Sequence, residues 1–170
     1  MREIRKFVTK QFGSPSGLFG KIIGNRMAKG NVYDARWTIS LLEIQPDHRI
    51  LEIGFGPGVS TQMASAKASK GFVSGIDHSQ TMVQAASQRN ADAIRSGRVE
   101  LRHGDVSALP YPAESFDVAF SLHSIYFWRN PVDGGIARLG RTHAVLTMLT
   151  PFRSVAEVRA SIAKIGRAHV

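Results

Sequence analysis

The segment LEIGFGPGVST, residues 51–61, constrains the fold of this chain more than any other. An apolar run ends at Ile53, three glycines follow within five positions, and helix-like residues begin at Val59. Gly54, Gly56 and Gly58 allow the backbone to turn tightly and to approach a ligand without an intervening side chain. The helix that follows presents free N–H groups at its amino terminus. The segment therefore predicts a strand, a turn and a helix that bind a nucleotide-like ligand.

Beyond residue 47, short strand-like runs alternate with helix-like runs. This alternation predicts an α/β fold, a Rossmann-like three-layer α/β/α sandwich with a mostly parallel sheet. With 170 residues and 43% hydrophobic content, one domain with a real core is expected. The expected strands are Arg49–Ile53, Phe72–Ile76, Val99–His103, Phe116–Ser121 and Ala144–Thr150, and the expected helices are Val59–Ser69 and Ser79–Arg95, with Ser79 and Thr81 as candidate caps.

A helical lead, residues 1–46, is predicted to precede the core, residues 47–151, and residues 152–170 form a carboxyl-terminal remnant. The lead includes a helix over residues 33–44 and is expected to act as a lid over ligands. Residues 1–30 carry seven Lys and Arg against one acid, giving +6 of the net +9. Such a basic lead suits an anionic membrane surface or nucleic acid, and it equally suits a solvated helix face.

Composition excludes several classes of site. The chain has no cysteine, which excludes a disulfide framework, a thiolate metal site and a cysteine nucleophile. The histidines lack metal-ligand spacing, so no metal site is expected, and no serine lies in the G-x-S-x-G context of a hydrolase. No apolar run reaches the length of a membrane span, so a cytoplasmic protein is the expectation.

The glycine turn itself distinguishes between two ligand classes. A dinucleotide fingerprint, G-x-G-x-x-G, requires a third glycine where this sequence has Val59. Glu52, two positions before the first glycine, would repel a pyrophosphate and suits a ligand that carries an ammonium and a sulfonium. The turn therefore favours a cationic nucleoside ligand.

Acidic residues end the next two expected strands. Asp77, 21 positions beyond Gly56, lies where a carboxylate can accept both hydroxyls of a ribose. Asp105 is placed to accept from an adenine amino group, with the Val106 N–H near a ring nitrogen. Met82 offers a flexible apolar surface for the adenine face. Each signal is weak alone, because acids often cap loops and helical methionines usually lie in cores.

Taken together, HRILEIGFGPG, VSGIDHSQTMVQAA and RHGDVSALPYPAESFDVAFS resemble the motifs of class I S-adenosylmethionine-dependent methyltransferases, near the bacterial type 11 group. The resemblance covers residues 47–131. It implies that the glycines line the methionine and ribose portions of S-adenosylmethionine, that Glu52 holds its amino group directly or through water, and that Ser121 and Leu122 border its methyl group. The full implied cofactor set is Glu52, Gly54, Phe55, Gly56, Pro57, Gly58, Asp77, His78, Met82, Gly104, Asp105, Val106, Ser121 and Leu122.

The carboxyl third departs from the family pattern. Two glycines, Gly134 and Gly135, stand where a helix should begin, and the last two family strands have no room to follow. The final residues, IGRAHV, resemble a translated sequencing adapter. We therefore expect a truncated sheet with an exposed edge, and residues 134–143 and 165–170 are suspect as native sequence.

The acceptor side is predicted from residues near the end of the fourth expected strand. His123 is the candidate base, with Tyr126 beside it, and its alternative role is packing at the strand end. Trp128 is a candidate wall of the acceptor pocket or part of a packed helix. Tyr33 and Trp37 are candidate lid residues that contact the substrate.

The sequence thus predicts transfer of a methyl group from S-adenosylmethionine to a small-molecule or lipid acceptor. Three alternatives remain open, namely a non-catalytic S-adenosylmethionine-binding module, an RNA methyltransferase and an NAD-dependent oxidoreductase. The tetrapeptide SLHS, residues 121–124, is unlike the N/D-P-P-Y/F motif of nucleic-acid methyltransferases, which argues against a nucleic-acid partner. The dinucleotide alternative requires Val59 in place of a glycine.

Overall fold

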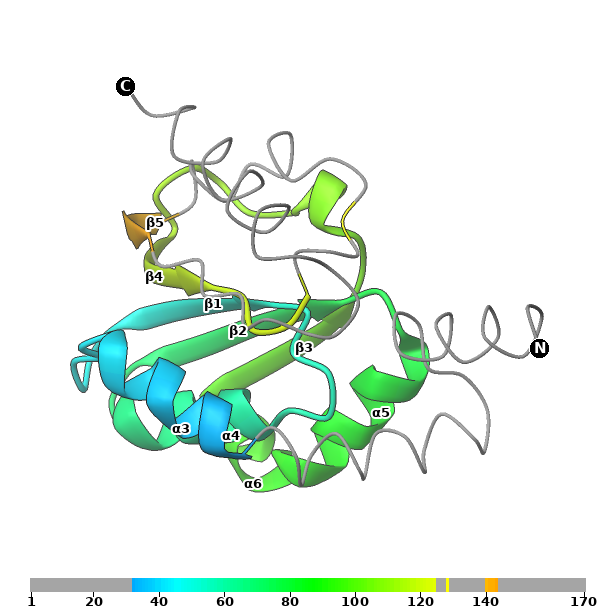
Figure 1. Cartoon of the computed structure of the whole chain (residues 1–170), viewed down its shortest axis with the longest axis horizontal. Coiled ribbons are helices and arrows are strands. Elements are labelled where there is room, and N and C mark those ends of the chain that lie inside the picture. Colours follow the sequence, from blue (N-terminus) through cyan, green and yellow to red (C-terminus); the bar gives the residue numbers. More distant parts are fainter. Residues whose placement is uncertain (1–31, 125–127, 129–139, 144–170) are drawn as a thin grey trace.

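A computed structural model describes residues 32–124, 128 and 140–143, which form a twisted sheet with helices packed on it (Figure 1). The described strands are β1 (Arg49–Ile53), β2 (Phe72–Asp77), β3 (Val99–His103), β4 (Phe116–Phe120) and β5 (Gly140–His143). Their order is β3-β2-β1-β4-β5, and every neighbouring pair is parallel. The predicted α/β fold with a parallel sheet is confirmed.

The first four strands begin where the sequence predicted them, and their ends differ by at most one residue. The fifth strand differs. It occupies Gly140–His143 and pairs with β4 from Phe116 to Ala119, whereas Ala144–Thr150, the range predicted for it, lies outside the described residues. The prediction missed this start because a run of Gly, Arg, Thr and His lacks the β-branched pattern of a buried strand.

The described α-helices cover one face of the sheet, below it in Figure 1. They are α3 (Val32–Leu41), α4 (Val59–Lys67), α5 (Gln80–Arg89) and α6 (Ala91–Arg95). The single helix predicted over residues 79–95 is divided at Asn90, whose side-chain amide donates to the Ala86 carbonyl at 2.9 Å. The predicted cap at Ser79 is confirmed, because its hydroxyl accepts from the Met82 N–H at 3.4 Å.

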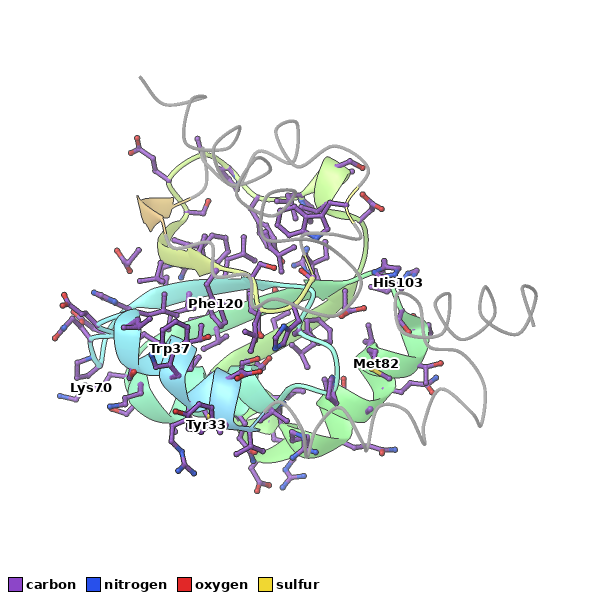
Figure 2. All side chains as sticks on the ribbon, viewed as in Figure 1. Tyr33, Trp37, Lys70, Met82, His103 and Phe120 are labelled. Atoms are coloured by element: carbon purple, nitrogen blue, oxygen red, sulfur yellow. The ribbon has the colours of Figure 1, made fainter. Side chains whose placement is uncertain are left out.

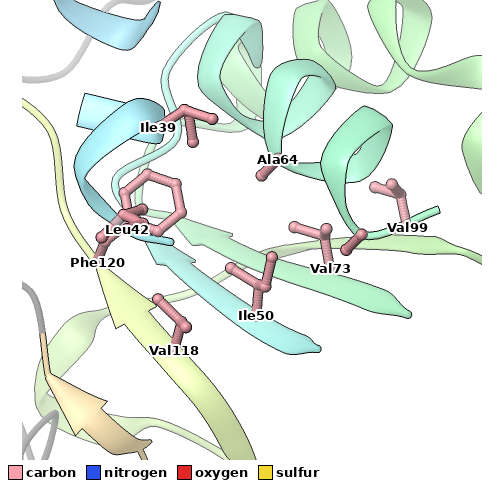
Figure 3. Close-up of a cluster of buried hydrophobic side chains, with 9 residues drawn as sticks. Ile39, Leu42, Ile50, Ala64, Val73, Val99, Val118 and Phe120 are labelled. Atoms are coloured by element: carbon pink, nitrogen blue, oxygen red, sulfur yellow. The ribbon is translucent and has the colours of Figure 1, made fainter. Parts of the chain in front are cut away.

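The core on the helical face joins α3 to the sheet (Figure 3). Ile50, Val73, Val99 and Val118 project from four adjacent strands, since alternate strand residues share a face. The remaining buried members of this cluster are Ile39, Leu42, Ala64, Ala68 and Phe120. The last turn of the predicted lead is thus part of the same hydrophobic core as β1.

The opposite face of the sheet is also apolar. Leu51 and Ile53 alternate with Ile50 along β1 and pack with Phe116 and Ala119 of β4. The Tyr111 ring contacts Phe116 edge-on and its hydroxyl hydrogen-bonds the Ser74 hydroxyl at 2.7 Å. Burial on both faces explains why these strands read as nearly continuous hydrophobic runs. The second helical layer predicted for this face stays a prediction, because the described α-helices lie on the other face.

Candidate functional site

The glycine turn joins β1 to α4 at the carboxyl end of the sheet. Gly54, Gly56 and Gly58 adopt φ of 72°, 53° and 77°, values that other residues rarely take. The Gly54 N–H donates to the Ile76 carbonyl at 2.8 Å, which ties the turn to β2. A Cβ at Gly54 would collide with Ser124, whereas one at Gly56 would meet nothing within 4 Å. The turn is therefore packed at its start and open at its middle.

The far end of the turn is held by α5, an arrangement that sequence reasoning missed. The buried Asn90 amide donates to the Gly58 carbonyl at 3.1 Å, and the Arg89 guanidinium donates to the Pro57 carbonyl at 2.9 Å. A Cβ at Gly58 would lie 2.7 Å from the Ala86 Cβ. The available signal in the sequence was Asn90, a polar residue near the end of a helical run. Its partner, Gly58, lies 32 positions away in sequence.

Asp77 ends β2 with its carboxylate aimed at the glycine turn. One oxygen accepts from the Gly56 N–H and the other from the Ser79 N–H, both at 2.8 Å. The side chain is 6% exposed, and burial raises the pKa of this carboxyl above its ordinary value while the two amide donors oppose the rise. A carboxylate has about four acceptor positions, so about two remain for ribose hydroxyls.

Glu52 lies beneath the first turn of α4 and not on the open side of the glycine turn. Its carboxylate accepts hydrogen bonds from the hydroxyls of Ser60 and Thr61, the latter at 2.6 Å. The side chain is completely buried, and this desolvation, only partly offset by the two hydroxyls, raises the pKa of Glu52 to about 7. The predicted contact with an amino group of the cofactor stays a prediction.

The raised pKa makes stability depend on pH in a definite direction. The folded state binds the Glu52 proton more tightly than the unfolded chain, whose ordinary value is 4.5. The resulting stabilisation is full below about pH 4.5 and is lost as pH rises to about 7, a change of about 3 kcal/mol. We expect Glu52→Gln, which has nearly the same shape and cannot titrate, to abolish this loss. Urea unfolding at pH 4.5 and pH 7.5 measures it.

The matched control is Glu100→Gln on β3, where the wild-type side chain is 42% exposed. This variant should retain the wild-type change in unfolding free energy between the two pH values. Parallel pH profiles for the wild type and Glu52→Gln would show that the buried carboxyl keeps its ordinary titration. A profile flattened only in Glu52→Gln identifies the titrating group.

The residues predicted to hold an adenine lie around the end of β3. Asp105 is exposed and caps a short 3-10 helix, Val106–Ala108, by accepting from the Ser107 N–H at 2.8 Å. Val106 is 8% exposed and packs in the core of the second sheet face. Met82, on α5, is 2% exposed, so it packs as a core residue (Figure 2). Asp105 and Val106 thus follow β3 at the predicted edge of the sheet, whereas Met82 lies on α5, and their contact with an adenine stays a prediction.

Other members of the predicted cofactor set divide between the core and the surface. Phe55 is 3% exposed and packs over Gly75 of β2, where a Cβ would lie 2.7 Å from its ring. His78 is exposed, and its carbonyl contacts the His103 ring at 3.0 Å. Gly104 follows β3 and its N–H donates to the Asp77 carbonyl at 3.0 Å. Pro57 is buried in the glycine turn.

The segment after β4 returns to the glycine turn. The Ser124 hydroxyl donates to the Ile53 carbonyl at 3.0 Å and lies 2.5 Å from the Ser121 hydroxyl. Leu122 packs with Ala35 of α3 and Val59 of α4. Residues 121–124 therefore bridge the glycine turn and α3, and the predicted contact of Ser121 and Leu122 with a ligand stays a prediction.

His123 follows on this segment and contacts Asp34 of α3, a partner that sequence reasoning did not identify. The distance from His123 Nε2 to Asp34 Oδ2 is 3.0 Å. The two residues lie 89 positions apart, and no sequence motif links them. Tyr126, the other predicted catalytic residue, lies outside the described residues.

The predicted substrate residues occupy different surroundings. Tyr33 and Trp37 are 78% and 44% exposed, because α3 turns Ala35 and Ile39 inward and leaves them outside (Figure 2). Trp128 packs against the core on the second face of the sheet. In the described part of the chain, these three residues do not form one pocket wall, and their contact with an acceptor stays a prediction.

Two kinds of structure are absent from residues 32–124, 128 and 140–143. These residues contain no helix that is long and apolar enough to cross a membrane. They also contain no group of three or more His, Asp or Glu side chains placed to hold a metal ion.

Comparison with known proteins gives consistent matches. The family model described as "Methyltransferase domain" matches residues 50–144, more than half of the chain. The chain is 32% identical to an uncharacterized methyltransferase, YdaC, of Bacillus subtilis over 66% of its own length and 60% of the relative's. It is 35% identical to the 27-O-demethylrifamycin SV methyltransferase of Amycolatopsis mediterranei over 51% of its length and 31% of the relative's.

A solved structure extends the likeness over most of the chain. The crystal structure of a SAM-dependent methyltransferase from Aquifex aeolicus superposes with a TM-score of 0.66 at 18% identity, covering 92% of this chain and 85% of that one. At this identity the likeness concerns the fold. The chain spans only 60% and 31% of the two curated relatives, so it corresponds to part of their length.

Proposed function

Since this chain belongs to the methyltransferase-domain family of class I S-adenosylmethionine-dependent proteins, we propose that it transfers a methyl group from S-adenosylmethionine to a small-molecule or lipid acceptor. The observation that carries this proposal is the Asp77 carboxylate, held against an open glycine turn at the carboxyl ends of β1 and β2. This edge, beside the reversal of strand order at β1, is where α/β sheets bind nucleotides.

The residues present fit the cofactor. The open position at Gly56 gives a ligand access to the main chain, and Asp77 retains acceptor positions for two ribose hydroxyls. Asp105 and Val106 would meet the adenine, and Ser121 and Leu122 would border the reacting methyl group. The Asp77 carboxylate beside the turn provides a negative charge for a ligand that carries a sulfonium and an ammonium group.

When bound, S-adenosylmethionine supplies a methyl group already activated by its sulfonium. The tasks left to this chain are to hold the acceptor in line with that group and to exclude water. Residues 121–124 are suited to the first task, because the hydrogen bond from the Ser124 hydroxyl to the Ile53 carbonyl of β1 fixes them beside the glycine turn.

Two observations support a small-molecule or lipid acceptor. The rifamycin enzyme of Amycolatopsis mediterranei is named for a small-molecule substrate. Tyr33 and Trp37 are exposed on the outer side of α3, and a strongly basic stretch of sequence directly precedes them. Aromatic side chains next to basic residues are suited to contact with a lipid surface.

Calorimetric titration of the chain with S-adenosylhomocysteine tests the proposal, with NADH as the matched control ligand. We expect saturable binding of S-adenosylhomocysteine and none of NADH. Binding of NADH alone would instead establish the dinucleotide alternative. Circular dichroism accompanies each titration, and absence of binding by a folded chain would contradict the proposed function.

A further inference from the structure

The His123 ring is held between the segment after β4 and the first turn of α3. Its Nε2 lies 3.0 Å from Asp34 Oδ2, and the two side chains are 14% and 26% exposed. Partial burial of the pair strengthens its electrostatic interaction compared with a surface pair. The contact therefore fixes the orientation of the ring and attaches α3 to the carboxyl end of β4.

The backbone at His123 is held in a strained conformation. Its φ is 58°, in the left-handed region, which costs a residue other than glycine about 1 kcal/mol or more. The next residue holds this conformation in place, because the Ser124 hydroxyl donates to the Ile53 carbonyl at 3.0 Å. Strain maintained in this way is found at functional sites more often than elsewhere, and here it directs the ring toward α3.

The Asp34 contact determines which ring nitrogen carries the proton. A carboxylate accepts hydrogen bonds, so the neutral tautomer that fits this contact carries its proton on Nε2. The lone pair is then on Nδ1, which is buried and has no hydrogen-bond partner among the described residues. Buried acceptors without a partner are uncommon in proteins, so this nitrogen lacks a hydrogen-bond donor that a bound molecule would supply.

We propose that Asp34 and His123 form an acid–histidine pair that deprotonates a hydroxyl group of the acceptor, so that the chain methylates an alcohol or a phenol. This inference rests on the proposed function. The acceptor oxygen bonds to the methyl carbon as its O–H proton passes to His123 Nδ1. The carbon–sulfur bond breaks, its electron pair stays on sulfur, and the imidazolium later releases the proton to water. Asp34 is a positioning residue that also stabilises the imidazolium.

The hydroxyl class follows from what a base contributes. A neutral amine attacks with its own lone pair and loses its proton afterwards, so a base adds little to that transfer. A hydroxyl is a weak nucleophile until its proton is removed, and a positioned base then accelerates transfer by about 10²–10⁴-fold. Among the described residues, the charged side chain that contacts the His123 ring is Asp34. The neighbours of His123 in sequence, Leu122 and Ser124, are uncharged.

The first experiment reads the tautomer by nitrogen NMR of the chain labelled in its histidine rings. We expect His123 to carry its proton on Nε2 in the wild type. We expect a mixture of tautomers in Asp34→Asn, whose amide can donate to Nε2, and recovery of the wild-type pattern in Asp34→Glu. A proton on Nδ1 in the wild type, or a pattern unchanged in Asp34→Asn, would overturn the proposal. This readout requires no cofactor or acceptor.

The second experiment measures transfer from methyl-labelled S-adenosylmethionine to 1-naphthol and to 1-naphthylamine. We expect O-methylation of 1-naphthol, with kcat lowered about 100-fold in His123→Gln and at least tenfold in Asp34→Asn at nearly unchanged KM. Asp34→Glu should recover part of the rate, and Asp92→Asn, an exposed acid on α6, should retain all of it. S-adenosylhomocysteine binding should be unchanged in all four variants.

The outcomes separate this inference from the proposed function. Transfer to 1-naphthylamine or to a ring carbon of 1-naphthol, without O-methylation, would overturn the hydroxyl assignment and leave the methyltransferase proposal standing. So would no transfer to 1-naphthol by a wild-type chain that binds S-adenosylhomocysteine. A wild-type chain that is folded but does not bind S-adenosylhomocysteine would contradict both.

Discussion

Asp77→Asn is expected to weaken S-adenosylhomocysteine binding about 10²–10⁴-fold. The variant keeps the size of the side chain but loses the charge and half of its acceptor positions. Hydrogen bonds to a charged group contribute about 1.5–3 kcal/mol each, and two ribose hydroxyls depend on this carboxylate in the proposed complex. Each 1.4 kcal/mol corresponds to a tenfold change in affinity. Isothermal titration calorimetry of the wild type and the variant measures the ratio.

The control for this prediction is Asp117→Asn. Asp117 also accepts a backbone hydrogen bond, from the Arg49 N–H at 2.8 Å, but it lies where β1 and β4 begin, away from the glycine turn. The Asp117→Asn variant should bind S-adenosylhomocysteine with the affinity of the wild type. Because Asp77 also accepts from Gly56 and Ser79, thermal unfolding must show that Asp77→Asn is folded. A folded Asp77→Asn variant with wild-type affinity would remove the carboxylate from the site.

Gly58→Ala is expected to destabilise the fold by about 2–5 kcal/mol. Two costs combine at this position. The φ of 77° is strained for any residue with a side chain, and the new Cβ would lie 2.7 Å from both the Ala86 Cβ and the Asn90 amide nitrogen. Neither neighbour can withdraw easily, because Asn90 is held by hydrogen bonds to Gly58 and Ala86. Urea unfolding at equilibrium measures the loss.

Gly97→Ala separates the two costs. Gly97 has φ of 72°, but a Cβ there would meet nothing within 4 Å, so only the backbone cost of about 1 kcal/mol applies. Ala86→Gly combined with Gly58→Ala should recover part of the loss, since it removes one of the two colliding groups. Equal losses in Gly58→Ala and Gly97→Ala would show that α5 moves away and that the contact between α5 and the turn is not tight.

Local patterns were sufficient for much of the fold. The strands were recognised from runs of β-branched residues, and the turn from the glycines after the first strand. Both signals lie in residues that are neighbours in sequence. The structure confirms the first four strands and the parallel sheet. The end of the long predicted helix could not be found in this way. Asn90 divides it because its amide reaches Gly58, a partner supplied by the tertiary fold.

The candidate site likewise contains residues that the sequence identified and contacts that depend on the tertiary fold. The sequence by itself determined the glycine turn, because a turn with three positive φ values requires glycine. It also determined the acid at the end of β2, because a carboxylate is costly to bury unless it is paired or hydrogen-bonded. Only the tertiary structure decided that Glu52 faces Ser60 and Thr61 and that Asp34 meets His123. Side-chain direction and long-range pairing depend on how α3 and α4 pack on the sheet, which local sequence does not encode.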